Sequence, residues 1–310
     1  MTFAEIAVEL LQAVLLIAFA PLMSGIKALM QGRVGASIFQ PYRDLRKLIG
    51  KDAVTSRSCS WLFRGVPYVC MASMIVLAMM TPFIYTGVLA PFGDLVTVVY
   101  LFTMFRFAMV LGGLEGGSAF GGMGSSREMM MSVLIEPALL LAIATLAVLS
   151  GAGTDMGDIS SAISAMGLAA VGPALILAGA SFMITLLAEN ARIPFDNPTT
   201  HLELTMVHEA MMLEYSGRGL AFMEYSSMLR LTIFMAMLGS LFFPWGIADQ
   251  LTVGSVVLSI AIAAVKIMAV AFVLSLVESV LCKSRLFKTP NLLTASFTLS
   301  LMAMISLYIL

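Results

Sequence analysis

Long apolar segments follow one another along this chain of 310 residues, and short polar stretches separate them. There are eight such runs, at residues 3–23, 66–89, 95–113, 129–150, 168–188, 219–243, 254–280 and 291–309. About 20 apolar residues suffice for a helix to cross a bilayer, and only helices or closed barrels satisfy the backbone in lipid. The runs are too long and too uniformly apolar for barrel strands. We therefore predict an all-α polytopic membrane protein with eight transmembrane helices and a single domain over residues 1–310.

The positive charges indicate the orientation. Outside the apolar runs, Lys and Arg are confined to alternate loops, at about 27–65, 114–128, 189–218 and 281–290. The other loops, near 90–94, 151–167 and 244–253, carry aspartates but no Lys or Arg. The positive-inside rule makes the first set cytoplasmic and places both termini outside. We therefore expect the lipid bilayer as a partner of this chain and no nucleic acid.

Cofactor motifs are scarce. The three cysteines, Cys59, Cys70 and Cys282, have no C-x-x-C spacing, and there is no P-loop or dinucleotide-binding glycine motif. An iron–sulfur cluster or a nickel site needs clustered thiolates. We therefore expect no metal, cofactor or catalytic site in this chain alone.

The segment 189–218 holds five of the 18 acidic residues and both histidines. Its ionisable residues are Glu189, Arg192, Asp196, His201, Glu203, His208, Glu209, Glu214 and Arg218. Prolines 194 and 198 predict a turn, and Thr200 with Glu203 fits a capping box for a helix that includes His201 to Glu214. Crowded carboxylates near a membrane raise one another's pKa. The segment is therefore predicted to load protons or to sense charge at the cytoplasmic surface. Alternatives are a metal site of His201, Glu203 and His208, and a solvated loop that binds a basic partner.

Several charges lie inside the predicted spans. Arg106, Arg230, Lys266 and Glu136 are near the middle of four different runs, and Glu224 is nearer a cytoplasmic end. Each charge at the bilayer centre costs at least about 2.5–3.5 kcal/mol, so these side chains should face the bundle interior with partners. We predict a hydrated polar track through the bundle. Glu224 and Glu136 lie at its cytoplasmic entrance, and the three cations lie in its middle. The alternative is static ion pairing that only fixes helix packing.

Other features concern local structure and docking. Leu45, Leu48 and Ile49 at helical spacing, beside basic residues, predict a short interfacial helix that faces headgroups or a partner; a solvated loop is the alternative. The residues predicted to dock a partner are Arg33, Arg43, Arg46, Lys47 and Arg127. Asp94 is placed to cap the third span. The glycines at 112–124 predict a tight connector or, as an alternative, a ligand cradle.

The motif E-x-x-R-x-P-F-D at 189–196, followed by E-Y-S-G at 214–217, resembles the eight-span membrane subunit that forms the quinone chamber of respiratory complex I. It also resembles the counterpart of that subunit in energy-converting group 4 NiFe hydrogenases, including formate hydrogenlyase. Further matches are G-R-x-G at 32–35, Q-P at 40–41, S-S-R-E at 125–128 and E-P at 136–137, so the resemblance covers essentially the whole chain. The run 197–203 departs from the family by lacking two acids, whereas residues 42–48 and 287–290 are closer to the hydrogenase side.

The resemblance implies a membrane anchor and coupling subunit of an oxidoreductase complex. It would dock an iron–sulfur small subunit and a NiFe-type large subunit on the cytoplasmic side, beside an antiporter-like membrane subunit. Iron–sulfur clusters, and a Ni–Fe centre if the large subunit retains one, would lie in those partners. Electron transfer there would drive proton or sodium translocation here. The alternatives are a quinone-chamber subunit of a complex I-type quinone oxidoreductase and a stand-alone secondary transporter, which the lack of an inverted repeat weakens.

Overall fold

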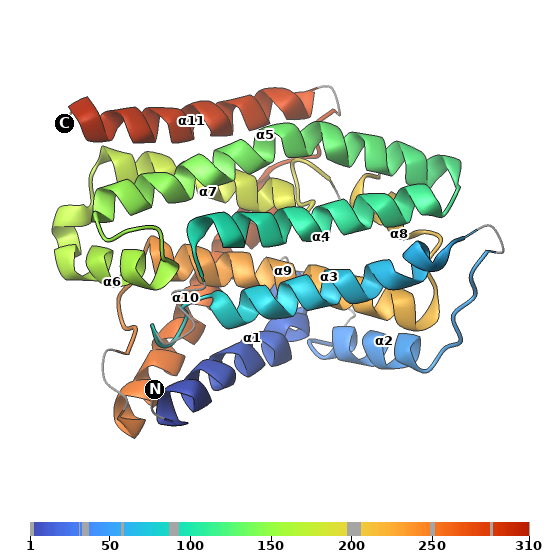
Figure 1. The fold of residues 1–310 in the computed structure, drawn as a ribbon, viewed down its shortest axis with the longest axis horizontal. Coiled ribbons are helices and arrows are strands. Elements are labelled where there is room, and N and C mark those ends of the chain that lie inside the picture. Colours follow the sequence, from blue (N-terminus) through green and yellow to red (C-terminus); the bar gives the residue numbers. More distant parts are fainter. Residues whose placement is uncertain are drawn as a thin grey trace.

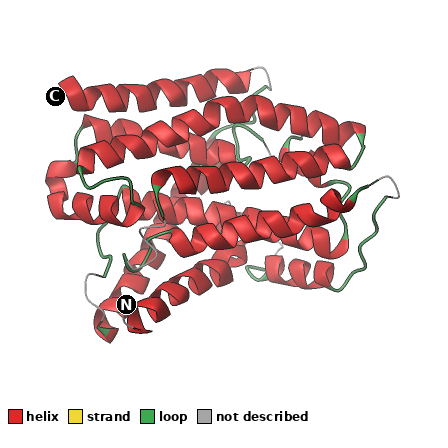
Figure 2. Cartoon of the chain, viewed as in Figure 1, coloured by secondary structure: helices red, strands yellow, loops and turns green. Residues whose placement is uncertain are grey.

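Every predicted apolar run coincides with a helix in the computed structural model, which describes residues 3–30, 32, 37–56, 59–86, 93–196, 206–248, 252–285 and 288–309. The long helices are α1 (Phe3–Met30), α3 (Trp61–Met80), α4 (Leu95–Glu115), α5 (Ala119–Ser150), α7 (Pro173–Glu189), α9 (Gly217–Leu241), α10 (Val253–Val280) and α11 (Thr289–Ile309). Between them lie the short helices α2 (Gln40–Ile49), α6 (Met156–Met166) and α8 (His208–Met212), and the 3-10 turn η2 (Gly167–Ala170). Within these ranges the chain contains no strand (Figure 2).

Six of the long helices are long and apolar enough to cross a membrane: α1, α3, α4, α5, α10 and α11. Helix α7 is apolar but has only 17 residues. Helix α9 has 25 residues but contains Arg218, Glu224 and Arg230. The protein is thus an all-α polytopic membrane protein, as predicted.

The long helices run side by side, with both termini and α6 at one end of the bundle and α2 and α8 at the other (Figure 1). Helix α11 packs against α5 and α7, α3 packs against α4 and α9, and α1 packs against α9 and α10. Helix α9 lies at the centre, since every residue from Leu229 to Leu241 is buried. The segments predicted to be cytoplasmic therefore gather around α2 and α8.

Several elements differ from prediction. The run predicted at 66–89 is helical only to Met80 among the described residues. Helix α5 begins at Ala119, ten residues before the apolar run. Ser118 caps this helix, because its Oγ accepts a hydrogen bond from the Gly121 amide. The predicted loop 114–128 is thereby reduced to a short connector between α4 and α5. Helix α6 was not predicted; it follows Asp155 and buries Ile159 and Ile163 on one face. The predicted cap of α4 is confirmed, since Asp94 accepts the Val96 amide.

Gly124 of α5 lets this helix approach α8 closely. A Cβ at Gly124 would lie 2.8 Å from the carbonyl oxygen of Val207 and 2.9 Å from Ala210 Cβ. No atom lies within 4 Å of a Cβ built at Gly122. Gly124 therefore serves close backbone packing of the segment that carries the site.

Substituting alanine at these two positions should therefore have opposite effects. Gly124→Ala should destabilise the chain by about 1–3 kcal/mol, because backbone of the α8 segment must move away. Gly122→Ala, the matched control in the same helix, should stabilise it by up to about 1 kcal/mol through helix propensity. Thermal denaturation midpoints in detergent measure both, and equal midpoints would contradict the close packing.

Candidate functional site

A cluster of charged side chains is buried where α4, α5, α7, α8 and α9 meet. Its two cations are Arg106 on α4 and Arg230 on α9, which are 2% and 0% exposed. Its carboxylates are Glu128 and Glu136 on α5 and Glu189 at the end of α7, and His208 on α8 completes it. Two guanidinium groups thus face three carboxylates inside the bundle, and we call this set the charged cluster.

Arg106 binds all three carboxylates. Its Nε lies 3.2 Å from Glu128 Oε1, its Nη1 lies 3.2 Å from Glu136 Oε1, and its Nη2 contacts Glu189 Oε1. Removing charges from water is costly, and their attraction offsets the cost only when the geometry is good. Of the three contacts only the one from Nη1 to Glu136 is a hydrogen bond, and Arg106 is held to Glu128 and Glu189 by the attraction of opposite charges.

Arg230 is held less completely. Its Nη2 lies 3.1 Å from His208 Nε2, and its guanidinium lies 4.6 Å from the centre of the Phe105 ring. Its Nη1 is 3.9 Å from Glu189 Oε2, which is too far for a hydrogen bond. Glu189 Oε2 has no hydrogen-bond partner in the described part of the chain. Arg230 is therefore held by His208 and the Phe105 ring and has no close carboxylate contact within the ranges that the structure covers.

His208 is neutral in this environment. Burial, and then the positive charges of Arg230, Arg106 and Arg192, hold the pKa of His208 well below its ordinary value. A neutral imidazole lets Nε2 accept a hydrogen bond from Arg230. His208 therefore orients Arg230 without adding a third cation.

The cluster reaches the edge of the subunit at Glu136. The Glu136 side chain is 33% exposed, whereas those of Glu128 and Glu189 are 3% and 1% exposed. Eight residues of α5 separate Glu128 from Glu136, which is about 12 Å of helix. The charges thus extend along α5 from near its N-terminal end toward its middle.

Asp196 and its neighbours connect three segments that the charge pattern predicts to be cytoplasmic. Its Oδ1 accepts a hydrogen bond from Lys283 Nζ at 2.6 Å, and its Oδ2 accepts from the Val207 amide at 2.9 Å. The Ser284 amide and hydroxyl both donate to the Pro194 carbonyl. The turn after α7 is therefore clamped to the start of α8 and to the α10–α11 connection.

This clamp corrects one prediction. In the described part of the helix predicted for 201–214, which is 206–214, only His208 to Met212 are helical, and they form α8. The Val207 amide bonds to Asp196, and the Met206 carbonyl accepts from Arg127, so both groups are used in tertiary contacts. Thr200, His201 and Glu203 lie outside the described residues.

A separate cavity lies beside the cluster. It has a volume of about 440 Å³ and lies between α1, α8 and α9. It is lined by Ser24, Arg192, Glu209, Met212, Leu213, Tyr215, Leu220, Glu224, Ser227 and Met228. Arg192, Glu209 and Glu224 are thus brought together, but around a cavity and not within the cluster.

The other predicted residues are placed elsewhere. None of the described contacts joins Lys266 on α10 to the charged cluster, although the predicted track included it. Glu214 is exposed. Helix α2 confirms the predicted short helix, with Leu45 buried and Arg43, Arg46 and Lys47 exposed. Arg33 lies outside the described residues.

Two residues of the site were missed from the sequence. Glu128 follows Arg127 in the S-S-R-E motif, which was interpreted as part of a loop, so its position inside a helix was not foreseen. Lys283 was counted only as one of the positive loop charges. One sequence signal for Glu128 was available: it is an acidic residue in a polar motif directly before an apolar run.

No group of three or more His, Cys, Asp or Glu side chains suited to a metal ion occurs among the residues that the structure covers. His208 Nε2 is already engaged by Arg230. Two of the three residues of the alternative metal site, His201 and Glu203, are outside those ranges.

Comparison with known proteins places the whole chain in one group. The NADH dehydrogenase family matches residues 4–309. Formate hydrogenlyase subunit 4 of Escherichia coli (strain K12) is 35% identical over 303 residues, which are 96% of this chain and 97% of that protein. Hydrogenase-4 component C of the same organism is 34% identical and covers 95% of this chain and 93% of its own length.

A solved structure supports the same fold. A chain of the membrane-bound sulfane sulfur reductase, an archaeal respiratory membrane complex, superimposes with a TM-score of 0.79. The two chains are 21% identical, and the match covers 96% of this chain and 99% of the other.

Proposed function

Because the chain belongs to the NADH dehydrogenase family, in which formate hydrogenlyase subunit 4 is a relative over nearly its full length, we propose that it is the membrane anchor and coupling subunit of a multisubunit redox complex. It is a single eight-span domain with both termini on the outer side of a prokaryotic cytoplasmic membrane. It docks an iron–sulfur small subunit and a NiFe-type large subunit on the cytoplasmic side, and an antiporter-like subunit lies beside it. Electron transfer in the arm drives proton or sodium translocation.

The observation that carries this proposal is Glu189, which joins the cytoplasmic loop to the buried cluster. Glu189 is the last residue of α7, and the clamped turn that ends in Asp196 follows it directly. Its carboxylate contacts Arg106 and faces Arg230. A shift of the turn therefore moves the group that both guanidinium groups share.

The coupling route follows from these contacts. Reduction or oxidation in the docked arm changes the charge next to Asp196 and the exposed Arg43, Arg46 and Lys47 of α2. The turn that ends in Asp196 then shifts, and protonation of Glu189 changes the strength of its ion pair with Arg106. That change reaches Glu136, where the cluster meets the edge of the subunit and a membrane neighbour. This chain contributes protonatable side chains and no redox centre.

Asp196→Asn tests the coupling role of the loop. The substitution keeps the size of the side chain but removes the charge that pairs with Lys283, so the turn should no longer transmit a change from the arm. We expect ion uptake per electron to fall in membrane vesicles, while the iron–sulfur subunits still co-purify. Asp158→Asn, an exposed aspartate on α6 at the opposite end, is the matched control. An unchanged ratio in Asp196→Asn would remove the loop from the mechanism.

A second candidate is a quinone-chamber subunit of a complex I-type quinone oxidoreductase. The cavity between α1, α8 and α9 favours it, since 440 Å³ is within the roughly 300–1,000 Å³ typical of ligand pockets and polar side chains line it. Inhibition of electron transfer by quinone-site inhibitors, lost on Ser227→Trp, would support this candidate. Insensitivity to them leaves the hydrogenase-type role. A stand-alone secondary transporter has no comparable observation in its favour.

A further inference from the structure

Lys266 on α10 is a cation in the middle of a membrane-spanning helix. It is 13 residues from Val253 and 14 from Val280, so about 20 Å of helix separates it from either end. Its side chain is too short to reach headgroups over that distance. No described residue forms an ion pair or hydrogen bond with it. A charge at this depth is costly unless a partner neutralises it.

The surroundings of Lys266 indicate where such a partner lies. Its stem runs over Gly239 of α9, since a Cβ built at Gly239 would lie 3.4 Å from Lys266 Cβ. Ala269 and Val273 follow at one and two turns on the same side of α10, and both are exposed. Helix α10 is a peripheral span, with 28% of it buried against 56% for α4. Lys266 therefore lies at the border between α9 and the outer face of the molecule.

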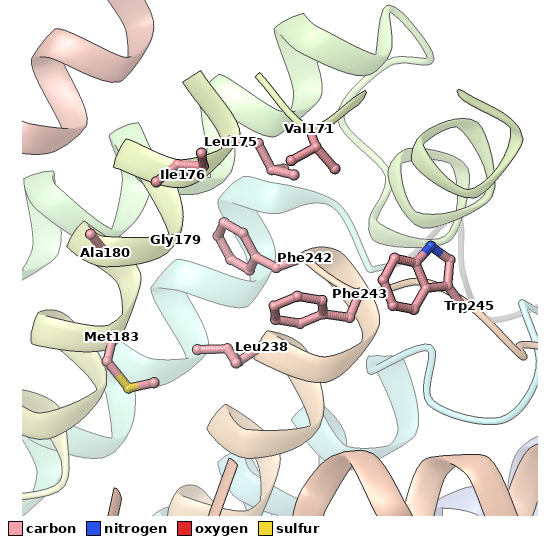
Figure 3. Close-up of a pocket in the computed structure, with 10 residues that line it drawn as sticks. All are labelled: Val171, Leu175, Ile176, Gly179, Ala180, Met183, Leu238, Phe242, Phe243 and Trp245. Carbon is pink, nitrogen blue, oxygen red and sulfur yellow. The ribbon is translucent and has the colours of Figure 1, made fainter. Parts of the chain in front are cut away.

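An apolar groove adjoins this border. It lies between α7 and the outer end of α9, has a volume of about 520 Å³, and is lined by Val171, Leu175, Ile176, Gly179, Ala180, Met183, Leu238, Phe242, Phe243 and Trp245. Figure 3 shows these side chains converging from the two helices. Leu238 lines the groove, and the next residue of α9, Gly239, lies against Lys266, so the groove and the cation are neighbours on two sides of α9. We call the groove together with Lys266 the Lys266 surface.

We propose that a transmembrane helix of another membrane subunit covers the Lys266 surface and places an Asp or Glu side chain opposite Lys266. A lipid chain would fill the groove but would leave the cation without a counter-charge at mid-depth. Gly179 and Ala180 in the groove also allow another helix to approach closely. The inference rests on the proposed function in requiring a membrane neighbour, and it adds where that neighbour binds and which charge it carries.

Photo-crosslinking in intact membranes tests the position of the partner. A photoreactive amino acid at Ile176, in the groove, or at Val273, beside Lys266, should yield an adduct with another membrane subunit. Phe272, on a different face of α10, is 57% exposed and is the matched control, which should yield none. Adducts with lipid or with a second copy of this chain, in a complex that retains its iron–sulfur subunits, overturn the inference but not the proposed function. A chain that purifies alone overturns the proposed function itself.

Charge substitution tests the counter-charge. Lys266→Met should weaken retention of the neighbouring membrane subunit by roughly 30-fold or more, because a carboxylate in the partner would be left unpaired. Lys266→Arg should retain it, as should Lys288→Met, which removes an exposed cation at the cytoplasmic end. An Asp or Glu→Lys change in the crosslinked helix should restore assembly of the Lys266→Glu chain. Unchanged retention in Lys266→Met overturns the inference.

Discussion

Replacing Arg106 with methionine should be the most destabilising single change in this protein. Arg106 is buried and contacts three carboxylates, so Arg106→Met leaves Glu128, Glu136 and Glu189 with Arg230 as their only described cation. Breaking a buried pair by removing one partner costs about 3–5 kcal/mol, because an uncompensated charge remains. Methionine enters a bilayer at a lower cost than arginine, but this does not offset the loss. The packed and the unpacked helices both lie in the membrane, so the insertion cost contributes to both states.

The thermal denaturation midpoint of the purified complex measures this effect. A loss of 3–5 kcal/mol corresponds to about 5–8 °C for a chain of this size. Adding Glu128→Gln to Arg106→Met should restore part of the loss, because it removes one of the stranded carboxylates. The control Arg64→Met removes an exposed cation at the start of α3 and should change stability by less than about 0.5 kcal/mol. A midpoint unchanged in Arg106→Met would mean that the three carboxylates have other partners.

Replacing Glu189 with glutamine should abolish coupled ion translocation while electron transfer in the arm continues. Among the described residues, Glu189 is the one carboxylate that faces both Arg106 and Arg230. Glutamine has nearly the same shape but can neither carry the negative charge nor bind a proton. Because a positioned proton carrier contributes about 10²–10⁴-fold to a transfer step, ion uptake per electron should fall at least about 100-fold.

Two measurements separate this effect from a loss of assembly. Electron transfer from the arm to a soluble dye should stay within about twofold of the wild type, and the iron–sulfur subunits should co-purify. Glu278→Gln, at the C-terminal end of α10 and outside the charged cluster, is the matched control and should pump normally. Full ion uptake in Glu189→Gln would exclude the cluster from the translocation path and leave it a purely structural ion-pair network.

Much of the fold could be predicted because it follows from local composition. Each apolar run became a helix, since a backbone in lipid has no other means of satisfying its polar groups over that length. The helix starts were less predictable. Helix α5 begins within a polar, glycine-rich stretch that is typical of a loop, and only its packing against α8 explains why glycines are tolerated there.

The charged cluster, like the fold, could be predicted from the sequence only in part. The sequence by itself determined that Arg106, Arg230 and Glu136 need partners inside the bundle, because an isolated charge in a bilayer is too costly. Only the tertiary structure decided the pairing: it selected Glu128 and Glu189 as those partners, turned Arg192 and Glu224 toward a cavity, and left Lys266 at the edge of α9. Hydropathy reports how deep a residue lies along its own helix. Which side chains meet depends on how five helices rotate and pack against one another, and no single helix carries that information.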